Sequence, residues 1–166
     1  MTVVLTGDWK ALDDIFKRLP RRVQKNIQLA TSRNASTVVT KTKKIIRDQS
    51  ENWPPLKPET IERKGSSKAL IEHGDLLGSI KKTEVMETVF FVGALRTARN
   101  RDGTSLADIY AVHEFGSWSA AGRSGGQSGI VPARSSLRPG LEQSEKACFT
   151  RWEKALDASL KGLKYA

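Results

Sequence analysis

The feature that most constrains the fold is a long helical pattern near the start of the sequence. Residues three or four apart fall on one stripe, namely Val23, Ile27, Ala30, Asn34, Val38, Thr42 and Ile45. This spacing predicts a helix from Pro20 to about Asp48, which at a rise of ~1.5 Å per residue is roughly 40 Å long. Because the stripe is thinly apolar, we expect the helix to pack across a sheet or against a neighbouring subunit.

A shorter helix is predicted before it, over residues 8–19, because Trp9, Leu12, Ile15, Phe16 and Leu19 keep the same spacing. Proline is tolerated in the first turn of a helix, so Pro20 predicts the start of the second helix. A helix-turn-helix over residues 8–47 would need a shorter second helix than the pattern predicts.

The middle of the chain predicts short elements. The prolines of Trp53-Pro54-Pro55-Leu56-Lys57-Pro58 exclude a regular helix or a central strand, and a short helix follows Pro58. Residues 79–84 and 88–92 predict two strands joined by a hairpin at Met86-Glu87. Residues 106–115 predict a helix that Gly116 ends.

Two loops and a last helix complete the prediction. We expect an exposed loop at 94–105 and a mobile, glycine- and serine-rich loop at 117–129, followed by an extended piece at 130–134. A final helix is capped by Ser135 or Ser136, with Pro139 in its first turn. Its predicted apolar stripe consists of Leu137, Leu141, Cys148, Trp152, Leu156, Leu160 and Leu163.

Composition limits the class of protein. A chain of 166 residues is long enough for one domain, which we place at 1–166. The single cysteine excludes an intramolecular disulfide and a multi-cysteine zinc site, which fits a reducing compartment. The start MTVVLTGDWK has no basic leader before an apolar run, so we expect no signal peptide, no membrane span and synthesis in the cytoplasm.

The net charge of +10 is concentrated in the first fifty residues, which hold eleven Lys/Arg against four Asp/Glu. A basic helix can meet nucleic acid, an anionic membrane or an acidic protein surface, or it can be a solvated face that aids solubility. The basic residues that we consider as DNA-facing are Arg21, Arg22, Lys25, Lys41, Lys43, Lys44 and Arg47.

The sequence does not predict an enzyme. His113-Glu114 could begin a zinc-protease helix, but Ser117 stands where the second histidine must be, and we expect structural roles for His73 and His113. Cys148 lies in an apolar stripe and is expected to be a small buried hydrophobe. There is no GxSxG motif and no phosphate-binding glycine loop, so we predict no catalytic residue, metal or cofactor.

One ordered set of short motifs is more specific than any single part. It consists of Trp53-Pro54-Pro55-Leu56, Leu70-Ile71-Glu72-His73-Gly74-Asp75-Leu76, Val92-Gly93, Tyr110-Ala111-Val112-His113-Glu114-Phe115-Gly116 and Ile130-Val131-Pro132-Ala133-Arg134. This order resembles the phage virion-morphogenesis family, which comprises the tail-completion proteins of Mu-like phages and related tail components of lambdoid phages. Ser135-Ser136 stand where that family usually has Pro-Phe, and His73 replaces its usual threonine.

The resemblance implies an α+β fold, in which a long helix packs across a small antiparallel sheet. It also implies a structural virion protein that forms a ring, commonly a hexamer, in the neck or upper tail beside other neck and tail proteins. The residues that we expect to make inter-subunit or fold-fixing contacts are Arg134, Glu114, His113, Trp53 and Phe115. The first alternative is a basic DNA-binding protein. The second is a nuclease, although the sequence lacks the clusters of acidic and metal-binding residues that a nuclease needs.

Two expectations concern these residues in particular. Arg134 is expected to make a fixed polar contact, because a guanidinium can bind a carboxylate through two hydrogen bonds, and Glu114 is its candidate partner. The aromatic residues Trp53, Tyr110 and Phe115, with Leu56, are expected to anchor the core or the loops. A basic helix face that lines a ring would suit sequence-independent contact with passing DNA.

Overall fold

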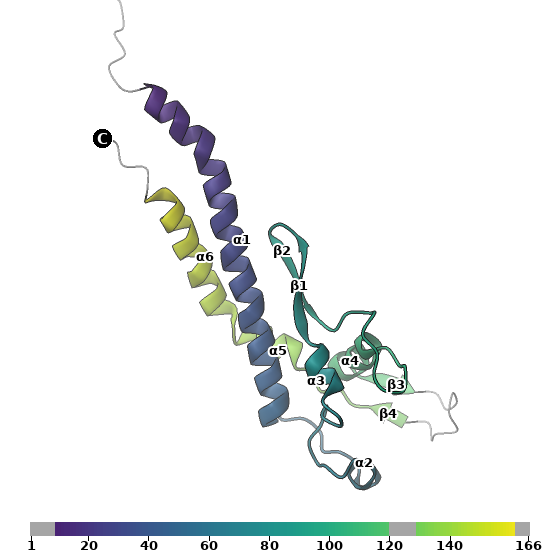
Figure 1. The fold of residues 1–166 in the computed structure, drawn as a ribbon. Coiled ribbons are helices and arrows are strands. Elements are labelled where there is room, and N and C mark those ends of the chain that lie inside the picture. Colours follow the sequence, from purple (N-terminus) through teal and green to yellow (C-terminus); the bar gives the residue numbers. More distant parts are fainter. Residues whose placement is uncertain (1–8, 120–128, 162–166) are drawn as a thin grey trace, which may run out of the picture.

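A computed structural model describes residues 9–119 and 129–161 (Figure 1). One long helix forms the spine of the molecule, a C-terminal helix lies along its middle, and a β-hairpin with several short elements lies on the other side. In chain order the elements are α1 (Trp9–Asp48), α2 (Pro58–Lys64), α3 (Asp75–Ser79), β1 (Lys81–Met86), β2 (Val89–Gly93), α4 (Leu106–Phe115), β3 (Ser117–Ser119), β4 (Gly129–Val131), α5 (Leu137–Glu142) and α6 (Glu145–Leu160).

α1 is continuous through Pro20, so the prediction of two helices divided at this proline is wrong. Proline removes one helical hydrogen bond, but its fixed φ is itself helical and the cost stays local. Contacts just beyond the proline favour one helix. Arg22 Nη2 donates to the Ala158 carbonyl (2.9 Å) and Asn26 Nδ2 donates to the Ser159 hydroxyl (2.8 Å), both on α6. The side chains of Leu12, Ile15 and Phe16 lie outside the described part of the chain.

The predicted stripe of α1 is confirmed as its inner face. Ala30, Asn34, Val38, Thr42 and Ile45 are all buried. Asn34 is a contact to α6 and does not interrupt the packing. Its Nδ2 donates to the Cys148 carbonyl (3.1 Å), and its side-chain oxygen accepts from Arg151.

The C-terminal prediction is corrected in two respects. The single helix that was expected is divided into α5 and α6 by a turn at Gln143 and Ser144, in which the Ser144 hydroxyl donates to the Gly140 carbonyl (2.7 Å). The buried face is also a different one. Gly140, Ser144, Cys148 and Ser159 are buried, whereas Leu141, Leu156 and Leu160 of the predicted leucine stripe are exposed. Leu163 lies outside the described residues.

Small residues of α5 and α6 face α1, and at Gly140 the helices α5 and α1 approach closely. A Cβ at Gly140 would collide with the Thr42 hydroxyl and lie 3.1 Å from the Thr42 backbone nitrogen. A leucine on this side would hold the helices apart, so the leucines are placed elsewhere.

β1 and β2 form the predicted hairpin, with Lys81 opposite Gly93 and Glu84 opposite Phe90. α1 packs across both strands. Part of that contact is polar, because Lys82 Nζ donates to the Ser32 hydroxyl (2.8 Å). A long helix across a small antiparallel sheet, with a C-terminal helix beside it, confirms the expected α+β class.

A compact apolar cluster lies where the end of α1 meets α3, α4 and the segment before α3. Its buried members are Ile46, Ala69, Leu70, Leu76, Ile80, Ala94, Leu106 and Tyr110, with Trp53 and Leu56 packed against it. Gln49, just after α1, holds the incoming chain in place: its side-chain oxygen accepts from the Ala69 N–H (2.7 Å) and its Nε2 donates to the Ala69 carbonyl (3.0 Å).

The two predicted loops differ. Residues 94–105 form a turn around Asn100, whose side-chain oxygen accepts from the Thr104 N–H (2.8 Å), and the Ser105 hydroxyl caps α4. The ends of the expected loop at 117–129 pair as β3 and β4, with Ser117 opposite Val131. The prediction of little fixed structure is therefore wrong for these ends, and residues 120–128 lie outside the described residues.

Candidate assembly interface

Arg134 fixes the proline-rich segment to the rest of the fold. The side chain is buried, and its Nε and Nη2 donate to the Pro54 carbonyl (3.2 and 3.0 Å), while Nη2 also donates to the Pro55 carbonyl (3.2 Å). Three prolines in this segment remove backbone donors, so its carbonyls need a partner from elsewhere in the chain. Arg134 makes a fixed polar contact, but its acceptors are these carbonyls, and the expected pairing with Glu114 is wrong.

Glu114 instead caps the start of α5. Its carboxylate accepts from the Ser135 hydroxyl and from the backbone N–H groups of Ser136 (2.8 Å), Leu137 (3.1 Å) and Arg138 (3.0 Å). The first N–H groups of a helix lack partners within the helix and carry its positive end, so a carboxylate fits there. Burial on its own raises the pKa of Glu114, but these hydrogen bonds together hold it below its ordinary value.

The other sequence motifs meet at the same place. Trp53 Nε1 donates to the Ser135 carbonyl (3.0 Å), and the Arg134 N–H donates to the His113 carbonyl (2.6 Å). Tyr110 shares a buried hydrogen bond with Ser136 (2.7 Å). Burial raises the pKa of the Tyr110 hydroxyl well above its ordinary value, so it stays protonated. Segments that lie far apart in the sequence are thus joined around residues 134–136.

Phe115 is the exception among the expected aromatic anchors. Its side chain is 75% exposed, so a core position for it is wrong. It lines an open groove of about 750 Å³ between β2, α4 and α5. Phe91, Leu95 and Leu141 line the same groove and are also exposed, although they are large and apolar. Exposed apolar patches of this kind are common at sites of protein or ligand contact, which makes the groove a candidate interface.

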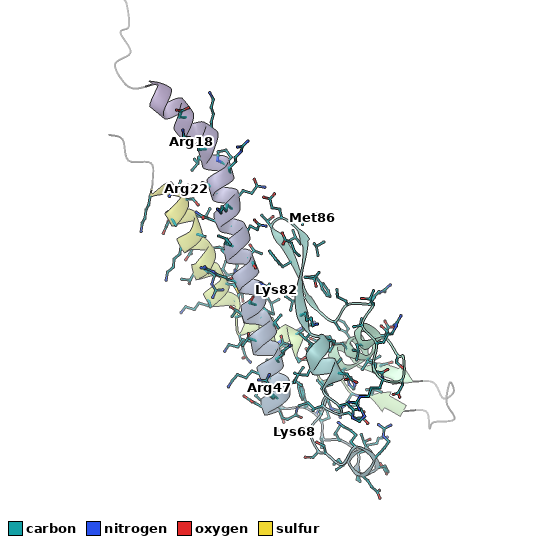
Figure 2. The ribbon with its side chains drawn as sticks, viewed as in Figure 1. Arg18, Arg22, Arg47, Lys68, Lys82 and Met86 are labelled. Atoms are coloured by element: carbon teal, nitrogen blue, oxygen red, sulfur yellow. The ribbon has the colours of Figure 1, made fainter. Side chains whose placement is uncertain are left out.

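A second exposed apolar surface is the tip of the hairpin. Val85, Met86 and Val89 are 58%, 68% and 48% exposed. Met86 projects from the end of the hairpin that lies away from α4 (Figure 2). The tip also carries Glu84 and Glu87, whereas Arg96 and Arg138 lie beside the groove.

The basic residues of α1 do not form one uniform face. Arg21, Lys25 and Arg47 are exposed, whereas Lys41 and Lys43 are half-buried. Lys41 and Lys43 are two positions apart, a spacing that does not share a helix face. Lys44 forms an ion pair with Asp48 (3.1 Å), and Arg22 is bonded to α6.

Reactive groups are few in the part of the chain that the structure describes. Cys148 is buried, and burial raises the pKa of its thiol, which suppresses the reactive thiolate. Within residues 9–119 and 129–161, no three His, Cys, Asp or Glu side chains are grouped so that they could hold a metal ion. None of the described helices combines the length and apolar character needed to cross a bilayer.

Sequence reasoning missed several residues of this surface. The sequence analysis placed Leu95 in a loop, Leu141 in the apolar stripe of the last helix, and Phe91 in a strand. No spacing rule marks these residues or the hairpin tip as exposed. Of the exposed residues that line the groove, Phe115 was named from the sequence as a contact residue, whereas Phe91, Leu95 and Leu141 were not. Neither the profiles of known protein families, nor the curated proteins, nor the solved structures give a match to this chain.

Proposed function

We propose that this chain is a structural, non-enzymatic virion protein of a tailed bacteriophage, made in the host cytoplasm. It assembles with copies of itself into a ring, commonly a hexamer, that completes the tail or joins it to the head beside other neck and tail proteins. The motif order set out above supports the phage assignment. The observation that carries the assembly is the exposed apolar groove lined by Phe91, Leu95, Phe115 and Leu141.

The occupant of the groove is the hairpin tip of a second copy. The groove is apolar with Arg96 and Arg138 beside it, and the tip is apolar with two acids beside it, so the two surfaces carry opposite charges. Both acids are held by α1, because Glu84 accepts from Gln28 (3.0 Å) and Glu87 accepts from Gln24. The two surfaces are different patches of one chain. A contact between different patches is head-to-tail, and it closes into a ring when the rotation between copies permits.

The direct test is electron microscopy of phage particles made without this protein and complemented with variants. Loss of the protein is expected to give filled heads beside separate tails, and the wild-type chain restores joined particles. Leu95→Ser in the groove is expected to fail to restore them. Leu29→Ser, an exposed leucine on α1, is the matched control and is expected to restore them. Joined, infectious particles in the absence of the protein contradict the proposal.

The second candidate is a basic protein that binds DNA without sequence preference, and the exposed Arg21, Lys25 and Arg47 favour it. Each phosphate contact adds about −0.9 to the slope of log K against the logarithm of the salt concentration. Replacing these three residues by alanine is therefore expected to reduce the slope by about 3. The exposed Lys57, Lys68 and Lys81, replaced together, serve as the control, and equal slopes for both triple variants rule out a DNA-binding face on α1.

A further inference from the structure

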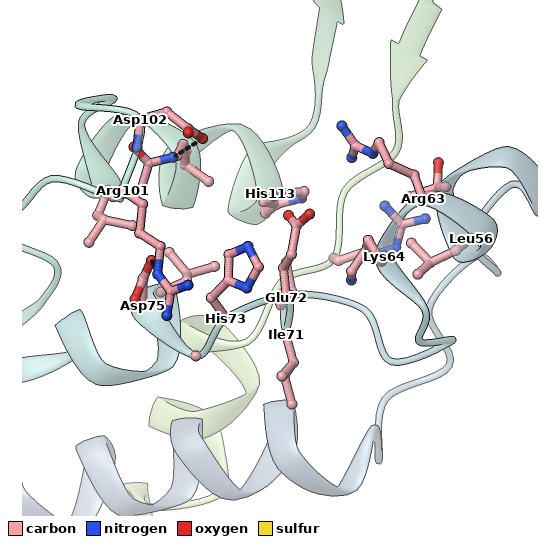
Figure 3. A pocket seen from close by; sticks show the side chains of 18 residues that line it. Leu56, Arg63, Lys64, Ile71, Glu72, His73, Asp75, Arg101, Asp102 and His113 are labelled. Atoms are coloured by element: carbon pink, nitrogen blue, oxygen red, sulfur yellow. Dashed lines mark hydrogen bonds and ion pairs between the residues drawn. The ribbon is translucent and has the colours of Figure 1, made fainter.

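A second pocket differs from the groove in its lining, which is rich in charged residues where the groove is largely apolar. It has a volume of about 340 Å³ and opens between α2, the segment 70–76, the turn at 100–102 and α4 (Figure 3). It shares no lining residue with the groove. Much of its lining is charged, which makes it a site for a polar ligand and not for an apolar segment.

His113 lines this pocket from α4 and has an unused nitrogen. Its Nδ1 is buried and has no hydrogen-bond partner within the described residues. Burial lowers the pKa of the imidazole, and the positive charges of Arg134 and Lys64 lower it further. The ring is therefore neutral at pH 7 and has one N–H to donate. This nitrogen is closed off from solvent, so the ring lines the pocket with its other atoms and reports on what binds there.

Two cations beside His113 also have donors to spare. The Arg134 bonds to the Pro54 and Pro55 carbonyls use Nε and Nη2, and its Nη1 has no acceptor within the described residues. Lys64 Nζ donates one hydrogen bond, to the Lys68 carbonyl (2.8 Å), and an ammonium has three donors. Partial burial is the main cause that lowers the pKa of Lys64.

The charge on this side of the pocket remains positive. Arg63 lies at its edge beside Lys64, and Glu72 is the acid that faces them (Figure 3). Glu72 acts on Lys64 as an opposite charge that raises its pKa, yet burial and the neighbouring cations outweigh it. On the far side of the pocket the acid Asp75 is already paired with Arg101 (3.9 Å).

We propose that this pocket binds a carboxylate, which accepts hydrogen bonds from Arg134 Nη1 and Lys64 Nζ and lies beside the His113 ring. A carboxylate has two oxygens that together accept several hydrogen bonds, so one group can satisfy both donors. The pocket is large enough for a short aliphatic chain behind that group. The carboxylate is either a free small acid or an acidic side chain of a neighbouring copy.

The test is a titration of the protein with sodium glutarate, followed by the NMR signals of the His113 ring, with sodium chloride at equal ionic strength as the reference. A saturable shift with a dissociation constant in about the millimolar range is expected for one carboxylate. Lys64→Gln is expected to weaken binding about tenfold, because it removes a charged donor. Lys57→Gln, an exposed lysine outside the pocket, is the matched control and leaves the affinity unchanged.

A second variant, Glu72→Gln, is not expected to change the stability of the fold, because Glu72 is exposed. A change in its glutarate affinity therefore reports on the charge of the pocket. Removing its negative charge is expected to tighten glutarate binding about threefold, the opposite direction to Lys64→Gln. A His113 signal that moves equally in chloride and glutarate, or a Glu72→Gln variant that binds no tighter, overturns the proposal.

The same signals distinguish the two sources of the carboxylate. If a neighbouring copy supplies it, the His113 signal of concentrated wild-type protein is already shifted without glutarate and returns on dilution. If it is a free acid, the shift requires glutarate at every protein concentration. The groove variant Leu95→Ser separates this result from ring assembly, because the two surfaces share no residue and the variant is expected to bind glutarate normally.

Discussion

At the scale of single residues, Glu114 shows how one side chain can hold a chain reversal. Its carboxylate accepts four hydrogen bonds from residues 135–138 and so ties the end of α4 to the start of α5. A buried hydrogen bond to a charged group contributes about 1.5–3 kcal/mol to stability. Glu114 is partly exposed, so solvent screening reduces the contribution of all four bonds together to about the value of one such bond.

We therefore expect Glu114→Gln to lower the free energy of unfolding by about 1–3 kcal/mol at pH 7. Because the pKa of Glu114 is held below its ordinary value of 4.5, its stabilising effect is present above that pH. The effect is lost as the pH falls through the lower pKa of the folded state. Urea unfolding from pH 3 to 7 checks this. The exposed Glu153→Gln is the control, and a difference from wild type that does not shrink below about pH 4.5 contradicts the charge-based explanation.

Gly140 carries the second residue-scale prediction. Gly140→Ala places a methyl group against Thr42, so we expect it to destabilise the protein by about 1–3 kcal/mol through overpacking. Gly78→Ala is the matched control, because a Cβ at Gly78, within α3, meets nothing within 4 Å, and alanine favours helix. Thermal unfolding of both variants measures the difference, and equal melting temperatures would show that α5 does not approach α1 as described.

Thr42 offers a prediction of the opposite sign. Its hydroxyl is buried and has no hydrogen-bond partner within the described residues. Thr42→Val replaces this hydroxyl by a methyl group of similar size, so we expect a gain in the free energy of unfolding of up to about 1 kcal/mol. Denaturant unfolding at neutral pH checks it, and a loss of stability would indicate that the hydroxyl has an unrecognised partner.

At the scale of elements, the continuity of α1 is the main departure from the sequence prediction. If the helix runs through Pro20, then Pro20→Ala restores a helical hydrogen bond at an exposed position and raises stability by about 1–3 kcal/mol. Hydrogen exchange of the amides around position 20 measures it directly. Unchanged protection and stability in the variant would favour two separate helices with a true break at the proline.

The helix faces explain why periodicity succeeded in α1 and failed in α6. Both helices show apolar residues at helical spacing, but α1 buries its stripe and α6 exposes both of its leucines, Leu156 and Leu160. The surface that α1 presents includes Asn34 and Thr42, which accept a small and partly polar partner. Thr42 meets Gly140 of α5 and Asn34 meets Cys148 of α6, so the buried faces of α5 and α6 depend on contacts between residues about one hundred positions apart. Local spacing does not contain that information.

At the scale of the whole molecule, the α+β class, the hairpin and α4 could be predicted because each depends on local patterns. The candidate site could be predicted only as a set of residues. Arg134 and Glu114 were predicted to pair with each other. Instead, Arg134 donates to the carbonyls of the proline-rich segment, and Glu114 accepts from the N–H groups at the start of α5. Backbone acceptors and donors have no sequence signature, so these partners became visible only when residues 134–138 were placed beside α4 and the proline-rich segment.

The exposed groove is the feature on which the account of the whole molecule depends. Native mass spectrometry of the purified protein at increasing concentration measures self-assembly directly, for the wild type and for the matched variants Leu95→Ser and Leu29→Ser. The account predicts a closed oligomer, commonly a hexamer, for the wild type and Leu29→Ser, and monomers for Leu95→Ser. A wild type that stays monomeric at every concentration, or a Leu95→Ser variant that assembles as the wild type does, would contradict it.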